Sequence, residues 1–356
     1  MRFAPTDDQI ALADAVSDLL MRECPPDAVR GAWETPDGRV PGLWDRLVEM
    51  GVVGICAAEE HGGLGLSMLD LVGVLVETGR AAAPEPVVDV AAVAVPLLDD
   101  VGGELAGTWV PSLVSGEASA AVGLERGVGA GNAVVENAAA ADVLLLGATG
   151  VSGDAEVHLV EAEAVTTTDR ASVDGSRRLA EVDWEPTSAT RIAGREALGV
   201  ARDRGNVATA AVLVGLGAAM LERTVEYAKE REQFGKPIGS FQAVKHHLAT
   251  AALGLEYARP VVDRGAYTLV YGGDTRRDSS IAMAYAAEAA HLAGRTALQV
   301  HGAIGYTVEY DLHLWMKRVW ALESAWGDAA FHREQVARRV LDSSPGAQDW
   351  TDKEHA

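Results

Sequence analysis

The apolar pattern changes twice along this chain of 356 residues, and the order of the three segments constrains the fold more than any single motif. The first hundred residues carry apolar side chains at helical spacing, whereas residues from about 110 to 190 carry short β-prone stretches separated by Gly, Asp and Ser. From about residue 203 onward the spacing is helical again, in runs longer than most globular helices. The order predicts an α+β protein with a bundle of long antiparallel helices at its C-terminal end.

The expected boundaries follow from these changes in texture. They are an N-terminal α-helical domain at 1–110, a middle antiparallel β-domain at 111–192, a C-terminal four-helix bundle at 193–343 and a polar tail at 344–356. Thr6 and Gln9 form a capping box, which predicts the start of the first helix. In the bundle we expect helices from Asn206 to about Glu230, from Phe241 to about Tyr271, from about Ser279 to His301 and from about Asp311 to Leu341.

The net charge of −22 restricts the possible partners. It opposes binding to nucleic acid or an anionic membrane, because every phosphate contact would work against the summed repulsion. The chain has no run of eighteen apolar residues and no signal peptide, so neither membrane insertion nor export is expected. Cys24 and Cys56 are expected to be reduced thiols of a cytoplasmic protein. The histidines show no zinc-ligand spacing, so we expect no metal.

Residues 231–242 form a polar, aromatic turn between two helical runs, with the sequence REQFGKPIGSFQ. The simpler interpretation is an interhelical loop in which Phe side chains anchor the core and Pro237 ends a helix. The functional interpretation gives Arg231 and Gln242 one shared groove. There an Arg fork suits a pyrophosphate, and Phe234 can flank an adenine or a flavin edge.

A second motif covers residues 299–314 and reads QVHGAIGYTVEYDLHL. In the simpler interpretation Gly302 and Gly305 close the C-terminus of a helix. In the functional interpretation Gln299 and the small residues Gly302 and Ala303 let a ligand approach the backbone amides. Either motif alone is weak, but both together in the third segment of a helix–β–helix chain are a specific combination.

The two motifs resemble those of the acyl-CoA dehydrogenases, flavoproteins that desaturate acyl-CoA thioesters between the α and β carbons. The family pattern R-x-x-F-G-x-x-I-x-x-x-Q matches from Arg231 to Gln242, and Q-x-x-G-G-x-G-Y matches from Gln299 to Tyr306, with Ala303 in place of the second Gly. The resemblance covers about residues 5 to 340. It implies FAD as cofactor and an acyl-CoA substrate. It also implies cofactor contacts from Arg231, Gln233, Phe234, Gln242, Gln299, Gly302 and Ala303.

Two departures concern the subunit's own flavin. Where the family cradles the flavin ring with a Gly-rich loop and a Trp-x-Thr/Ser segment, this chain reads GLERGVGAGN (residues 123–132) and AVVEN (133–137). With the family's Asn placed on Asn137, Val134 stands at the Trp position and Glu136 at the hydroxyl position. A carboxylate beside a flavin ring that accepts hydride is electrostatically unfavourable. The β-domain is also shorter than is usual in the family.

The family's catalytic base is missing as well. Most members place a Glu at the position that Trp326 occupies here, and a minority place it at the position of Gly205. Neither residue can take a proton. A three-residue slip would make Glu323 the base, but Arg333 keeps its register only without that slip. We therefore interpret Glu323 as a solvated or ion-paired helix residue and retain it only as a fallback.

In family tetramers the resemblance implies that the two retained motifs contact the neighbouring subunit's FAD, whereas the lost segments serve the subunit's own flavin. This is the pattern of a non-catalytic partner in a hetero-oligomer (α2β2), known among actinobacterial members acting on steroid side-chain thioesters. Their shortened chains end in a segment similar to residues 327–333 here. An electron-transfer flavoprotein is a further possible partner. Two alternatives remain open: a self-sufficient homo-oligomer using Glu323, and a helical scaffold without cofactor.

Overall fold

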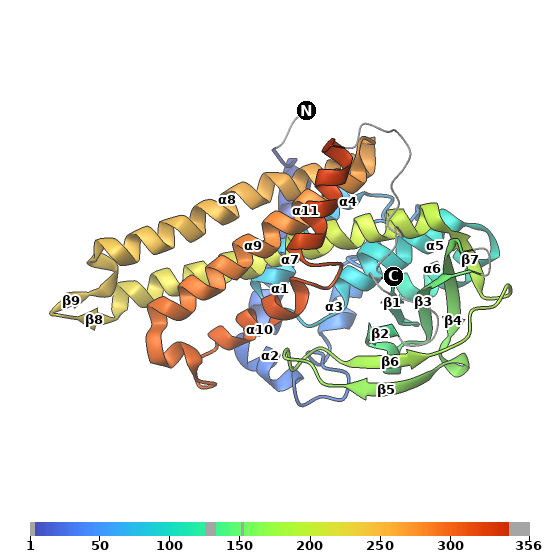
Figure 1. Cartoon of the computed structure of the whole chain (residues 1–356). Coiled ribbons are helices and arrows are strands. Elements are labelled where there is room, and N and C mark those ends of the chain that lie inside the picture. Colours follow the sequence, from blue (N-terminus) through green and yellow to red (C-terminus); the bar gives the residue numbers. More distant parts are fainter. Residues whose placement is uncertain (1–3, 125–132, 151–152, 342–356) are drawn as a thin grey trace.

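The computed structural model describes residues 4–124, 133–150 and 153–341 (Figure 1). The N-terminal domain consists of α1 (Asp7–Glu23), α2 (Pro26–Ala32), α3 (Leu43–Glu49), α4 (Met68–Arg80), the π-helix η2 (Val88–Ala94), α5 (Val95–Val101) and α6 (Gly103–Val114). The capping box at the start of α1 is confirmed, because Thr6 Oγ1 accepts from the Gln9 amide and Gln9 Oε1 accepts from the Thr6 amide. The helical–β–helical order is confirmed as well.

The β-domain contains two sheets. One has the strand order β1 (Ala120–Gly123), β3 (Val143–Thr149), β4 (Ala155–Glu161), β7 (Arg191–Gly194). The other has the order β2 (Ala133–Glu136), β6 (Leu179–Asp183), β5 (Thr166–Arg170). Strands β1 and β3 pair in parallel, which the prediction of an antiparallel domain missed; the other pairs of these two sheets are antiparallel.

The C-terminal part is built on three long helices that lie side by side, α7 (Arg195–Glu230), α8 (Gln242–Tyr271) and α9 (Thr275–His301), followed by α10 (Leu312–Leu322) and α11 (Ala329–Leu341) (Figure 1). Helix α7 starts eleven residues before the expected Asn206. The expected single last helix was wrong: between α10 and α11 the chain passes Gly327, whose φ of +112° is outside the helical region.

Helix α7 is the centre of the molecule. It is long and apolar enough to cross a membrane. However, 83% of its most apolar 18-residue stretch is buried inside the protein, as in a core helix. Its contact with α4 is made through glycines: a Cβ on Gly79 would lie 2.1 Å from the Val212 carbonyl oxygen, and one on Gly215 would lie 2.0 Å from that of Val76. The two backbones therefore touch directly, which fixes the N-terminal domain against the bundle.

A buried arginine connects the three parts of the chain. Arg318 on α10 pairs with Asp174 of the β-domain at 2.5 Å and donates to the Ala83 carbonyl of the N-terminal domain at 2.6 Å. It also donates to Ser176. Burial opposes ionisation of Asp174, but Arg318 and Ser176 outweigh it and hold the pKa of that carboxyl below its ordinary value.

Candidate functional site

One end of the helical bundle carries a two-residue hairpin with a strained turn. Strands β8 (Glu232–Gln233) and β9 (Lys236–Pro237) are joined by Phe234 and Gly235, whose φ values are +55° and +77°. Gly adopts this conformation freely, but a Phe there costs about 1–2 kcal/mol. Phe234 is 92% exposed, and the ring contact it makes is edge-to-face with Phe241, with centroids 6.1 Å apart. Little apolar surface is therefore buried to offset the strain.

The second motif lies at the same end of the bundle, because α7 and α9 both end there (Figure 1). Helix α9 stops at His301, and Gly302 continues with a φ of +65° into the 3₁₀-helix η6 (Gly302–Tyr306). A Cβ on Gly302 would meet nothing within 4 Å, so the backbone faces open space.

The structure thus brings both motifs to one end of the bundle, on exposed surface. We call the seven residues predicted to contact the cofactor the bundle-end patch; all of them are exposed: Arg231, Gln233, Phe234, Gln242, Gln299, Gly302 and Ala303. Within the described part of the chain, the side chains of Arg231, Gln242 and Gln299 make no hydrogen bond or ion pair, and Gln233 donates only to its neighbouring carbonyl. The patch therefore has its donors available for a ligand.

The interior position of the family's base is filled instead. Gly205 on α7 and Trp326, after α10, are far apart in sequence but in direct contact: a Cβ on Gly205 would lie 2.5 Å from the indole Cε2. Trp326 is only 4% exposed. The indole therefore packs on the bare backbone of α7, and neither of the two base positions presents a group that can accept a proton.

Beside Trp326 lies a small charged cavity at the junction of the three domains. Glu136 pairs with Arg177 at 2.6 Å, and Arg177 also donates to the Ala321 carbonyl of α10 at 3.1 Å. Asp89 lines the same cavity, and its burial, together with the charge of Glu136, raises the pKa of its carboxyl to about 8. The hydrogen bond from Arg177 to Ala321 thus joins the β-domain to α10, and Glu136, at the position aligned with the family's Thr or Ser, holds Arg177 in place.

This cavity does not fit a flavin. Its volume is about 60 Å³, and its wall includes Trp326, Glu136 and Arg177. Sites for ligands of cofactor size are usually about 300–1,000 Å³. A flavin ring with an acyl thioester would therefore require the indole and the ion pair to move. The Gly-rich segment that was compared with the family's flavin loop, residues 125–132, lies outside the described residues.

Glu323 is placed at the end of α10, and its Oε2 lies 2.9 Å from Nδ1 of His291 on α9. Leu322 and Ala325 line the small cavity, but Glu323 does not. This placement favours the interpretation of Glu323 as an ion-paired helix residue.

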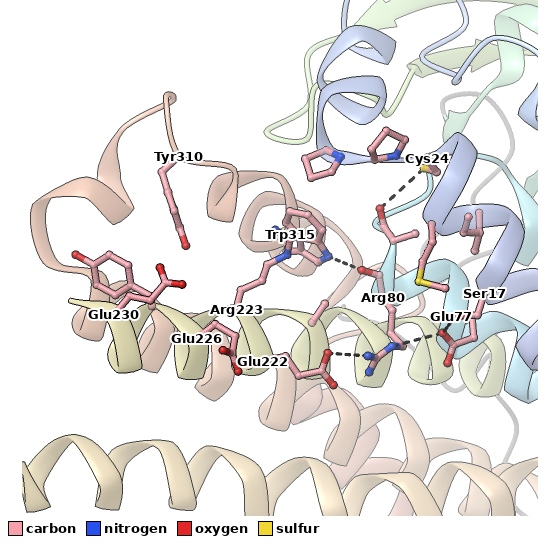
Figure 2. Close-up of a pocket in the computed structure, with 17 residues that line it drawn as sticks. Ser17, Cys24, Glu77, Arg80, Glu222, Arg223, Glu226, Glu230, Tyr310 and Trp315 are labelled. Carbon is pink, nitrogen blue, oxygen red and sulfur yellow. Dashed lines mark hydrogen bonds and ion pairs between the residues drawn. The ribbon is translucent and has the colours of Figure 1, made fainter. Parts of the chain in front are cut away.

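A larger cavity of about 620 Å³ opens between α1, α4, α7 and α10, and the sequence motifs did not indicate it (Figure 2). Arg80 bridges Glu222 at 2.6 Å and Glu77 at 3.4 Å across its floor. Arg223 stacks on the Trp315 indole, with its guanidinium carbon 4.0 Å from the ring centroid. Tyr227 and Tyr310 complete the wall beside the bundle-end patch. Tyr227 precedes Arg231 by one helical turn. This spacing is the sequence signal that could have linked Tyr227, and with it the cavity, to the first motif.

The fold defines a three-part protein, in which a β-domain lies between an N-terminal helical domain and a C-terminal bundle of long helices. Models of the acyl-CoA dehydrogenase N-terminal and C-terminal domains match residues 6–117 and 195–341. The chain is 31% identical over 325 residues to acyl-CoA dehydrogenase IpdE2 of Mycobacterium tuberculosis, covering 88% of this chain and 91% of that relative. The chain belongs to the acyl-CoA dehydrogenase family, whose members oxidise CH–CH bonds with FAD.

Solved structures agree with this assignment. The ChsE4–ChsE5 complex from Mycobacterium tuberculosis contains a chain with a TM-score of 0.90 and 27% identity, covering 97% of this chain and all of that one. A glutaryl-CoA dehydrogenase from Mycobacterium smegmatis in complex with FADH2 has the same fold at 17% identity, with a TM-score of 0.84 and 95% of each chain covered.

Proposed function

We propose that this chain is the non-catalytic subunit of a hetero-oligomeric, cytoplasmic acyl-CoA dehydrogenase, and that it completes the FAD site of a catalytic partner subunit. One observation carries the proposal. The bundle-end patch is exposed and has unused donors, whereas the cavity where the chain's own chemistry would occur is closed by Trp326 on Gly205. The similarity to a chain of the ChsE4–ChsE5 complex supports a heteromeric assembly.

The roles of this chain's residues follow from their chemistry. The Arg231 guanidinium offers two parallel donors to a pyrophosphate, and the exposed ring of Phe234 offers a face or edge to an adenine. Exposed backbone at Gly302 and Ala303 permits close approach of a ligand. FAD held between the two subunits would supply the acceptor for the hydride that leaves the β carbon of the thioester. The partner supplies the carboxylate that removes the α-proton.

The substrate class is an acyl-CoA thioester, for which we propose a lipid or steroid side chain as the acyl group. The proposed assembly is an α2β2 hetero-oligomer with two copies of this chain and two of the catalytic subunit. Electron-transfer flavoprotein is the proposed acceptor of the electrons.

The test compares this chain produced alone with the same chain co-expressed with its catalytic partner. We expect little FAD in the lone chain, and a yellow, active complex. Arg231→Ala should lower the FAD content and activity of the complex, because a charge-assisted pyrophosphate contact is lost, and an affinity loss of about tenfold or more is expected. Arg22→Ala, at an exposed position of α1, is the matched control.

Each alternative has its own signature. Stoichiometric FAD in the lone chain, with activity that Glu323→Gln abolishes, would replace the proposal with a self-sufficient homo-oligomer. A complex without flavin would indicate a scaffold.

A further inference from the structure

The two halves of the bundle-end patch come from different helices, so something has to fix their spacing. The hairpin half begins at Arg231, whose amide donates to the Tyr227 carbonyl at 2.8 Å at the end of α7. The other half surrounds His301, the last residue of α9, which is 4% exposed: Gln299 precedes it, and Gly302 and Ala303 follow it. Tyr227 and His301 are in contact, so one pair of rings joins the two halves.

The ring contacts define a single arrangement. The Tyr227 ring stacks on the His301 imidazole, with centroids 4.3 Å apart and planes 25° apart. His301 Nδ1 lies 2.8 Å from the Ala297 carbonyl oxygen, which can only accept, so Nδ1 carries the proton. Nε2 of the neutral ring is then an acceptor, and the Tyr310 hydroxyl donates to it at 3.0 Å. A Cβ on Gly305 would lie 3.1 Å from the His301 Cβ, so η6 folds directly against this histidine.

We propose that Tyr227, His301 and Tyr310 form an aromatic clamp that positions Arg231 relative to Gly302 and Ala303, and thereby sets the affinity of the bundle-end patch for the partner's FAD. This rests on the function proposed above and deepens it. Tyr227, His301 and Tyr310 are positioning residues. They hold the two halves of the patch at a fixed spacing and need not touch the cofactor.

The protonation state of His301 controls the clamp. Burial lowers the pKa of His301, although the hydrogen bond to Ala297 opposes this, so the ring is neutral near pH 7. Protonation in acid would remove the lone pair to which Tyr310 donates. Burial also raises the pKa of Tyr310, which therefore remains a donor.

The charged groups near the clamp come from both neighbouring elements. Arg223 and Glu230 of α7 and Asp311 at the start of α10 act on Tyr310, and Tyr227 faces both rings. Figure 2 shows the hydroxyl end of Tyr310 directed toward the helix that carries Arg223 and Glu230. Because Tyr227 and Tyr310 also line the 620 Å³ cavity, solvent protons can reach the clamp.

The test uses the complex with the catalytic partner and measures FAD dissociation across a pH series. Tyr310→Phe keeps the ring but removes the donor, and we expect a loss of FAD affinity of about 3- to 10-fold at pH 7. Without the hydrogen bond to Nε2 the neutral ring is less favoured, so the pKa of His301 should rise in an NMR titration of the free chain. Because protonation of His301 has no hydrogen bond from position 310 to break in this variant, the acid loss of FAD should disappear. Tyr271→Phe, at an exposed position of α8, is the matched control.

A second variant keeps the proposal testable if Tyr310→Phe disturbs folding. Gln at position 301 retains an acceptor and a donor but does not titrate, so His301→Gln should bind FAD and lose the acid limb. Should both variants bind FAD with the wild-type affinity and pH profile while Arg231→Ala does not, the clamp is overturned and the proposed function stands. FAD binding unchanged in all three would overturn both.

Discussion

Gly205 and Trp326 show how one pair of residues can fill the two positions at which relatives carry the catalytic base, leaving a cavity of only about 60 Å³ beside the indole. The indole uses the space that any side chain at position 205 would need, since a Cβ there would lie 2.5 Å from it. Gly and Trp at these two positions therefore depend on each other.

This dependence predicts the effect of a single methyl group. Gly205→Ala should lower the free energy of unfolding by about 1–3 kcal/mol, because the buried indole has to shift. Urea denaturation measures the effect. Gly31→Ala is the control, since a Cβ there meets nothing within 4 Å and alanine favours the helix. Trp326→Phe should recover part of the loss in the double variant, and a strictly additive double variant would contradict the contact.

Asp89 predicts a pH dependence of stability. Its pKa of about 8 in the folded protein lies above the usual value of 3.8, so the folded state holds a proton that the unfolded chain releases. The stability contribution is complete below about pH 4 and is lost as pH rises through 8. Because Asn does not ionise, Asp89→Asn should remove this decrease in the free energy of unfolding with rising pH. The variant should therefore gain stability relative to wild type at pH 8 but not at pH 4, in urea titrations at both values.

Burial also raises the pKa values of Glu85 and Asp203 to about 7. The stability of the Asp89→Asn variant should therefore still decrease with rising pH, but less than that of wild type. An Asp89→Asn curve parallel to wild type from pH 4 to 8 would show that Asp89 ionises normally.

At the scale of elements, the strained turn between β8 and β9 lowers the stability of the free chain, and the proposed FAD contact gives a reason to keep Phe234 there. Asn is the preferred residue before Gly in a two-residue turn of this kind. Phe234→Asn should therefore stabilise the free chain by about 1 kcal/mol, while the complex loses FAD affinity because the aromatic contact is gone. Thermal unfolding of the free chain and FAD titration of the complex check the two effects. Val173→Asn, at an exposed apolar position of the β-domain, should change neither. A destabilised free chain would show that Phe234 packs within this subunit.

The elements that the sequence predicted well are those whose signal is local. The Thr6 capping box and the expected limits of α8 and α9 came from caps and long apolar periodicity, and the structure places them within a few residues. Strand β5, with the sequence TTTDR, carries no apolar alternation because it lies at a sheet edge and is mostly exposed. The break before α11 depends on the backbone of Gly327, which composition does not reveal.

The residues of the bundle-end patch could be named from the sequence because they fall in two contiguous motifs, and the structure places them at one exposed end of the bundle. Their contact with a cofactor stays a prediction. The contacts of Trp326 with Gly205 and of Tyr310 with His301 could not be predicted from the sequence, since they join residues whose meeting depends on tertiary packing. The parallel pairing of β1 and β3 was missed for the same reason.

At the scale of the whole molecule, Arg318 carries much of the connection between domains. Arg318→Met would leave Asp174 buried without its cation, at a cost of about 3–5 kcal/mol. Because the arginine contacts both other domains, we expect the unfolding of the β-domain and the bundle to separate into two steps. Circular dichroism and tryptophan fluorescence during urea unfolding would show this as transitions that do not coincide.

Arg22→Met is the matched control, since Arg22 is exposed on α1 and makes no hydrogen bond or ion pair within the described ranges. A single coincident transition at unchanged denaturant concentration in Arg318→Met would exclude the proposed connection.

The exposed, strained turn at Phe234 has a consequence for the life of the protein in a cell. In a chain without the proposed partner, the turn exposes an aromatic ring that chaperones and proteases can recognise. If the proposed assembly covers this ring, surplus copies should be degraded faster than assembled ones, which would couple the abundance of this chain to that of the proposed partner.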